Sequence, residues 1–171
     1  DLTCGFGVKY VWRGRVTSVI GQEVRPSLRS IISSAHPLAS ARTCAKEAAK
    51  RMLGRLGSEK YAPHVENRAV FDAALRDGRP VCEFLRSNPY WKGVGLGATG
   101  REIGSVLNVA MLHRLVQRRG VCLLYTHLGK IRDINVPFDP PAAQAFKHVA
   151  QMQSDGRILV RTTSQIGRAH V

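Results

Sequence analysis

The sequence predicts an α/β fold built on a parallel sheet or a barrel. Helical patterns alternate along the chain with short apolar runs, which is the order of elements in such folds. One apolar run, residues 121–125, follows the helix-stopping Gly120, and such a run between turn signals is typical of a strand buried on both faces. A similar run, residues 158–160, follows the last helical pattern. We expect residues 81–85, 121–125 and 158–160 to be strands of one sheet.

Residues 7–20 are expected to form an early strand that bends or turns at Gly14, because β-branched and aromatic residues alternate loosely on both sides of that glycine. Trp12 is a candidate wall of a sugar site, with Arg13 beside it, since aromatic faces stack on sugar rings. The alternative for Trp12 is packing in the core.

Residues 21–37 contain prolines and serines without a clear period and predict a loop, with a short helical turn over residues 28–32. Residues 38–56 predict an amphipathic helix that Gly57 closes, with its basic side in solvent. The apolar positions that recur every three or four residues in this helix are Ala41, Cys44, Ala45, Ala48, Met52 and Leu56.

Residues 69–75 and 80–86 predict a hairpin, because Asp77-Gly78 between two partly apolar runs is a strong turn signal. The alternative is a two-turn helix over residues 68–76. Polar and aromatic candidates for substrate binding follow the second run, and a glycine-rich loop that can approach a ligand closely comes after them. These candidates are Glu83, Arg86, Asn88, Tyr90 and Trp91.

Two further helices are predicted from their ends. Thr99 and Glu102 form a capping-box pattern that opens a helix running to Arg119. Pro140 and Pro141 open a second helix, and Asp155-Gly156 turns the chain after it.

Polar side chains appear where residues 121–125 end, at Thr126, His127 and Lys130. Ligands lie outside the carboxyl ends of parallel strands, so we expect a site here, a concavity in which Arg86 and Glu83 lie close to His127 and Trp12 or Trp91 forms a wall. His127 is the candidate catalytic residue, because histidine is the usual side chain for proton transfer near neutral pH. The alternatives are a strand-end histidine bonded to backbone and, for Lys130, a solvated lysine after a glycine.

The composition indicates a globular chain of 171 residues with 44% hydrophobic residues. No apolar run is long enough for a membrane helix, and the first residues lack a signal-peptide pattern, so a cytoplasmic location is the default expectation. The four cysteines form no Cys-x-x-Cys pair, and we expect free thiols in a reducing compartment.

The net charge of +14 raises the alternative of a nucleic-acid-binding protein, with residues 9–15 as its best surface. Basic residues are spread through every segment rather than clustered, so we do not expect a nucleic-acid partner. The oligomeric state cannot be read from the sequence.

The ends of the chain suggest a gene fragment. It begins at Asp1 without methionine, and its last residues read like a translated sequencing adapter. We expect residues 1–165 to form a single partial domain and residues 166–171 to be an artefact.

Two stretches, residues 83–91 (Glu-Phe-Leu-Arg-Ser-Asn-Pro-Tyr-Trp) and residues 125–130 (Tyr-Thr-His-Leu-Gly-Lys), resemble the later half of an uncharacterised bacterial branch of the polysaccharide deacetylase superfamily. The resemblance covers roughly residues 7–163. It implies the C-terminal part of a distorted (β/α) barrel with parallel strands. It also implies a carbohydrate esterase that uses a divalent metal, usually zinc, to remove acetyl groups from amino sugars.

Within this resemblance, residues 86–90 match the family's arginine-proline-aromatic groove motif, and His127 matches its late histidine, the general acid that protonates the leaving amine. The aspartate pair and the His-x-x-x-His metal ligands are absent: His36 resembles the second histidine of that pair, but Ile32 stands four positions earlier. We therefore assign no metal ligand here, expect a metal only in the full-length protein, and expect the fragment to be inactive alone. The alternative is a catalytically silent carbohydrate-binding or structural relative.

Overall fold

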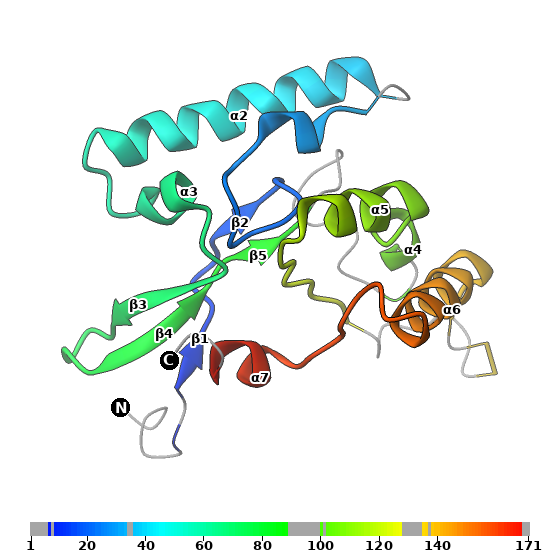
Figure 1. Ribbon diagram of the computed structural model, residues 1–171. Coiled ribbons are helices and arrows are strands. Elements are labelled where there is room, and N and C mark those ends of the chain that lie inside the picture. The colour runs from blue at the N-terminus through cyan, green and yellow to red at the C-terminus, as the bar shows by residue number, and fades with distance from the viewer. Residues whose placement is uncertain are drawn as a thin grey trace.

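A computed structural model of the chain describes residues 7, 9–33, 36–88, 100, 102–127, 135–136 and 138–168, and shows a mixed α/β arrangement of two small sheets with helices around them (Figure 1). The larger sheet has the strand order β1-β4-β3 and the smaller one pairs β2 with β5. Parallel strands are present, as expected. The described residues do not form a closed barrel.

In the larger sheet, β3 (Val70–Ala74) and β4 (Pro80–Phe84) form an antiparallel hairpin, with Val70 opposite Phe84. Gly78 has a φ of 81° in the turn, a backbone conformation that favours glycine. The hairpin prediction is confirmed and the alternative helix over residues 68–76 is wrong.

The N-terminal strands run parallel to the second half of this hairpin and to its continuation. β1 (Tyr10–Val11) pairs with β4, and β2 (Val16–Thr17) pairs with β5 (Arg86–Ser87). Gly14, with a φ of 84°, turns the chain between β1 and β2, as expected. This pairing brings the residues around Gly14 next to the start of β5.

The strand predicted over residues 121–125 is wrong. Its backbone is joined to the rest of the fold at two places only among the described residues: Val121 forms an isolated antiparallel bridge with Gln22, and the Leu123 carbonyl accepts a hydrogen bond of 2.7 Å from the Ser87 amide. Gly120 allows this approach, because a Cβ there would lie 2.6 Å from Gly21 Cα. Tyr125 then turns outward and is exposed.

The strand predicted over residues 158–160 is also wrong. Leu159 and Val160 are exposed, and Ile158 packs its side chain on the cluster of Ile20 and Met111. Ile158 is therefore partly buried by packing on other side chains, and its backbone does not have to pair in a sheet.

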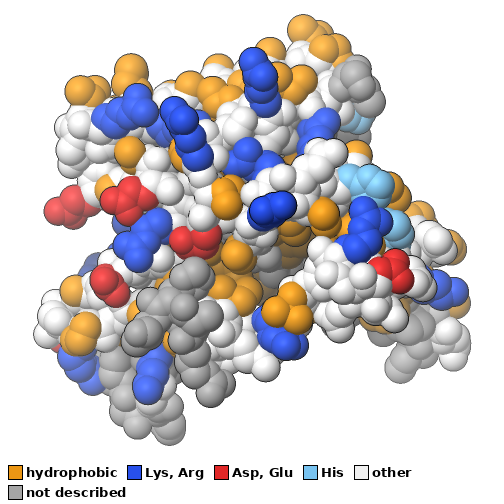
Figure 2. Space-filling view, in the orientation of Figure 1, with side chains coloured by type: hydrophobic (Ala, Val, Ile, Leu, Met, Phe, Trp, Pro, Cys, Tyr) orange, Lys and Arg blue, Asp and Glu red, His pale blue; other side chains and the backbone are white. Residues whose placement is uncertain are grey.

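The first long helix, α2 (Pro37–Arg55), confirms the helix expected over residues 38–56, and the 3-10 turn η1 (Leu28–Ile31) confirms the short turn before it. The predicted packing face is wrong: Ser40 and Glu47 are buried, whereas Met52 and Leu56 of the predicted face are exposed. Figure 2 shows hydrophobic side chains along the outside of α2, with Lys and Arg between them.

Polar contacts explain this orientation of α2. Glu47 accepts hydrogen bonds from the Ser18 amide and from Lys50, and it lies beside the buried His64 of α3 (Ala62–Glu66). A Cβ at residue 54 would lie 2.5 Å from the carbonyl oxygen of Tyr61. Glycine at this position therefore allows α2 to come this close to the segment before α3.

The continuous helix predicted up to Arg119 is wrong, because two helices stand in its place, α4 (Ile103–Val106) and α5 (Val109–Arg118). Asn108 breaks the run: its side chain accepts a hydrogen bond from the Met111 amide and caps α5. Thr99 lies outside the described residues.

The last two helices are α6 (Pro140–Ser154), which confirms the prediction from Pro140 and Pro141, and α7 (Thr163–Arg168). Gly156 follows α6 with a φ of 68°. Ile166 of α7 packs on Ala69, Val70 and Leu123.

The core has three adjoining parts around the ends of the sheets, centred on α5 with α6, on α4 with α6, and on β3 with Leu123. Of the described helices, none is both long and apolar enough to cross a membrane. Cys44, Cys82 and Cys122 are free thiols, as expected, and Cys4 lies outside the described residues.

Candidate functional site

Four side chains from three parts of the chain meet at the surface, and we call Trp12, Arg86, Tyr125 and His127 the arginine–aromatic cluster. The guanidinium carbon of Arg86 lies 5.1 Å from the centre of the Trp12 ring and 5.0 Å from that of Tyr125. Both distances are within the range of cation–π attraction. The two rings are near-parallel, and the Arg86 guanidinium lies close to both of them.

His127 joins the cluster through Tyr125. The Tyr125 hydroxyl lies 2.7 Å from His127 Nε2, and the two rings meet edge to face with their centres 4.7 Å apart. Residues two apart in an extended chain point to the same side, which brings these two side chains together. A phenol hydroxyl can donate to a neutral imidazole or accept from its N–H, so Tyr125 can orient His127 in either protonation state.

The Arg15 carbonyl fixes the two other members. Trp12 Nε1 donates to it at 2.8 Å, and the Arg86 amide at the start of β5 donates to the same oxygen at 3.3 Å. The turn at Gly14 makes the first of these bonds possible, since it folds the chain back three residues after Trp12. The sheet pairing therefore sets the position of the tryptophan ring.

Exposure differs sharply within the cluster. Trp12 is 39% and Tyr125 is 42% exposed, whereas Arg86 is 5% exposed. Burial lowers the pKa of the Arg86 guanidinium and the neighbouring Tyr125 opposes that shift. The cluster therefore offers aromatic surface and an exposed imidazole to solvent, with a cation behind the rings.

Glu83, expected at the same site as Arg86 and His127, lies in a separate group. Its carboxylate is fully buried, and Oε2 accepts a 2.6 Å hydrogen bond from Arg13 Nε and a second bond from Arg15. Oε1 of Glu83 is buried without a hydrogen-bond partner. Glu83 therefore fixes two arginines on the segment that carries Trp12.

The remaining sequence-based candidates are placed as follows. Asn88 is buried at the end of β5, where its amide donates to the Thr17 carbonyl at 2.7 Å. Tyr90, Trp91 and Lys130 lie outside the described residues. Tyr125 is the residue that sequence reasoning missed, because it was assigned to a buried strand. Its position two residues before His127 is the signal that would have found it.

The cluster forms a surface platform. Two cavities, of about 530 and 560 Å3, lie in the described part of the chain, and neither is lined by Trp12, Tyr125 or His127. The residues present do not fit a metal centre: within the described ranges, no three His, Cys, Asp or Glu side chains gather closely enough to hold an ion.

The fold and the platform together define a mixed α/β protein with an exposed arginine–aromatic surface site. Comparison of the sequence with protein-family models, with curated proteins and with solved structures finds no match.

Proposed function

We propose that this protein acts on carbohydrate and that the arginine–aromatic cluster binds the sugar. The observation that carries the proposal is the pair of exposed rings, Trp12 and Tyr125, held in place by the buried Arg86. Sugar rings present apolar C–H faces that stack on aromatic side chains. Because the rings are fixed before a ligand arrives, little side-chain entropy is lost on binding.

The resemblance to polysaccharide deacetylases supports a reaction at the same place, the removal of acetyl groups from an amino sugar. In this proposal His127 is the general acid, and the Tyr125 hydroxyl at 2.7 Å holds its ring toward the bound sugar. The described residues offer no metal cluster, so every role in this proposal belongs to a side chain. The parallel pairing of β1 with β4 and of β2 with β5 is compatible with part of a distorted (β/α) barrel.

The sugar-binding part is tested by titrating the 171-residue chain with a chitin oligosaccharide and following Trp fluorescence and heat. We expect Trp12→Ala to weaken binding about 5-fold, since an aromatic contact contributes about 1 kcal/mol. Trp12→Phe is the matched control, because it keeps a ring face and should retain most of the affinity. Equal affinity of Trp12→Ala and wild type would exclude the cluster as the sugar site.

The catalytic part has its own test. Deacetylation of an acetylated amino-sugar oligomer is measured with and without zinc, and His127→Ala is expected to lower turnover by about 10²-fold to 10⁴-fold where wild-type activity is present. Sugar binding without turnover in the zinc-loaded wild type would favour the silent carbohydrate-binding relative.

Nucleic-acid binding remains the alternative from another class, since Trp12 and Arg13 could stack on bases and contact phosphate. It predicts binding that falls steeply with salt, whereas stacking on a neutral sugar changes little with salt. A titration of an oligonucleotide and of the oligosaccharide at two salt concentrations separates the two.

A further inference from the structure

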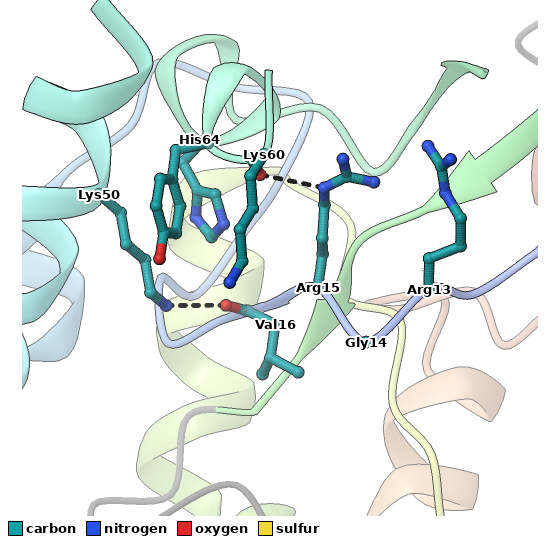
Figure 3. A pocket seen from close by; sticks show the side chains of 8 residues that line it. Arg13, Gly14, Arg15, Val16, Lys50, Lys60 and His64 are labelled. Atoms are coloured by element: carbon teal, nitrogen blue, oxygen red, sulfur yellow. Dashed lines mark hydrogen bonds between the residues drawn. The ribbon is translucent and has the colours of Figure 1, made fainter. Parts of the chain in front are cut away.

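A cavity of about 530 Å3 opens beside the segment that carries Trp12 (Figure 3), and none of the four residues of the arginine–aromatic cluster lines it. Its walls come from residues 13–16, from Lys50 of α2, and from Lys60, Tyr61 and His64 at the start of α3 and just before it. A volume of this size suits a small-molecule ligand.

The side chains that line the cavity are strongly basic. Four cations, Arg13, Arg15, Lys50 and Lys60, face the cavity. The two carboxylates that pair with three of them, Glu83 and Glu47, do not line the cavity, and both are almost completely buried. Four cations against two carboxylates leave a net of two positive charges at the walls of the cavity.

Hydrogen bonds hold the walls in position without a ligand. Lys50 Nζ donates to the Val16 carbonyl at 2.8 Å, and Arg15 Nε donates to the Lys60 carbonyl at 3.0 Å, as the dashed lines in Figure 3 show. These bonds tie α2 and the segment before α3 to residues 13–16. The site therefore does not have to be assembled when a ligand binds.

His64 also lines the cavity. Its side chain is 3% exposed, and its Nδ1 lies 3.6 Å from Oε2 of Glu47, whose carboxylate also pairs with Lys50.

We propose that this cavity binds the phosphate group of a small phosphorylated molecule. Arginine and lysine are the side chains that proteins use for phosphate, arginine as a planar fork and lysine as a point charge. The cavity is larger than a phosphate needs, and the Tyr61 ring on its wall can pack against an attached sugar or similar group. The site is distinct from the arginine–aromatic cluster, so its test does not depend on the proposed function.

The test is calorimetric titration of the 171-residue chain with glucose 6-phosphate at fixed ionic strength, with glucose as the neutral twin. We expect glucose 6-phosphate to bind and glucose not to bind. Lys60→Gln removes an exposed cation that has no carboxylate partner among the described residues, so the fold should be unaffected and affinity should fall about 10-fold. Arg76→Gln removes an exposed cation at the hairpin tip, outside the cavity, and should leave affinity unchanged.

Thermal unfolding gives a second readout. Glucose 6-phosphate should raise the melting temperature of wild type and of Arg76→Gln more than that of Lys60→Gln, because a ligand of the folded state stabilises it by mass action. Absence of binding by glucose 6-phosphate, or equal losses in Lys60→Gln and Arg76→Gln, would overturn the proposal. Tighter binding of a single-stranded oligonucleotide that Lys60→Gln also weakens would overturn it in favour of a nucleic-acid site.

Discussion

The rings of Trp12 and Tyr125 stack with their centres 6.3 Å apart and their planes 21° apart, although the two residues come from distant parts of the chain. Trp12 follows β1, and Tyr125 follows the bridge that Val121 forms with Gln22. The buried Arg86 guanidinium contacts both rings and links them to β5. This contact holds the surface platform together.

The first prediction concerns that guanidinium. Arg86→Met keeps a long side chain but removes the charge, and we expect it to lower the free energy of unfolding by about 2 kcal/mol, since two cation–π contacts are lost in a buried place. Arg86→Lys should lose less, because it keeps the charge. Urea unfolding followed by tryptophan fluorescence measures both, with Arg76→Met at the exposed hairpin tip as the control. A fully stable Arg86→Met protein would show that the ring contacts contribute little.

The second prediction concerns Glu83. Glu83→Gln leaves Arg13 and Arg15 without the buried carboxylate on which both converge, and we expect the protein to lose about 3 kcal/mol of stability. Asp77→Asn is the control, because the pair of Asp77 with Arg79 is exposed and its loss should leave unfolding unchanged. Equal denaturation midpoints for the two variants would contradict the structural role of Glu83.

The third prediction is a dependence of stability on pH. Burial alone raises the pKa of Glu47, but the nearby His64 ring, hydrogen bonds from Lys50 and the Ser18 amide, and the charge of Lys50 lower it to about 2 from 4.5. A carboxylate with a lowered pKa in the folded state stabilises the fold above its unfolded pKa. That contribution is therefore complete above pH 4.5 and is lost as the pH falls toward 2.

The measurement compares wild type with Glu47→Gln in urea unfolding at pH 6, 4 and 3. The stability difference between them should shrink by about 2 kcal/mol between pH 6 and pH 3, because only wild type loses the Glu47 contribution. A difference that stays constant over this range would show that the Glu47 pKa is close to its ordinary value.

The fourth prediction concerns the contact of α4 with α6. A Cβ at residue 104 would lie 2.7 Å from the carbonyl oxygen of Pro141, a backbone atom that cannot turn aside as a flexible side chain can. Alanine favours helices over glycine by about 1 kcal/mol, but we expect this clash to prevail and Gly104→Ala to destabilise the protein by about 1 to 3 kcal/mol. Ser105→Ala, at an exposed position of the same helix, is the control. A thermal melt in which Gly104→Ala gains stability would show that α4 can move away from α6.

The features predicted well from sequence are those that a few consecutive residues decide. Asp77-Gly78 determines the hairpin turn, Gly14 the turn between β1 and β2, and Pro140-Pro141 the start of α6. Each acts through its own backbone preferences, so partners elsewhere in the chain hardly matter.

The packing face of α2 could not be predicted in this way. The apolar period of the helix points outward, because Glu47 makes its contacts with Ser18, Lys50 and His64 on the inner side. Those partners lie on other segments, apart from Lys50, and nothing in the helix sequence identifies them. Buried polar contacts therefore outweighed the apolar pattern.

The candidate site was predicted in part. We expected Arg86 and Glu83 close to His127, with Trp12 or Trp91 as a wall, and the structure brings Trp12, Arg86 and His127 together through Tyr125. Glu83 instead pairs with Arg13 and Arg15. Adjacent residues of a strand point to opposite faces, so Glu83 and Arg86, three positions apart, have different neighbours.

The parallel pairing of the N-terminal strands affects how the chain folds as it is synthesised. Tyr10 pairs with Cys82, and Val16 pairs with Arg86, so β1 and β2 leave the ribosome well before the strands that complete their hydrogen bonds. Gln22 can form its bridge only with Val121, which is synthesised later than β4 and β5. Contacts between such distant segments form slowly, because a long loop must close first. β1 and β2 can therefore complete their pairing only after these later strands have been made, and until then their unpaired edges are open to chaperones or to neighbouring nascent chains.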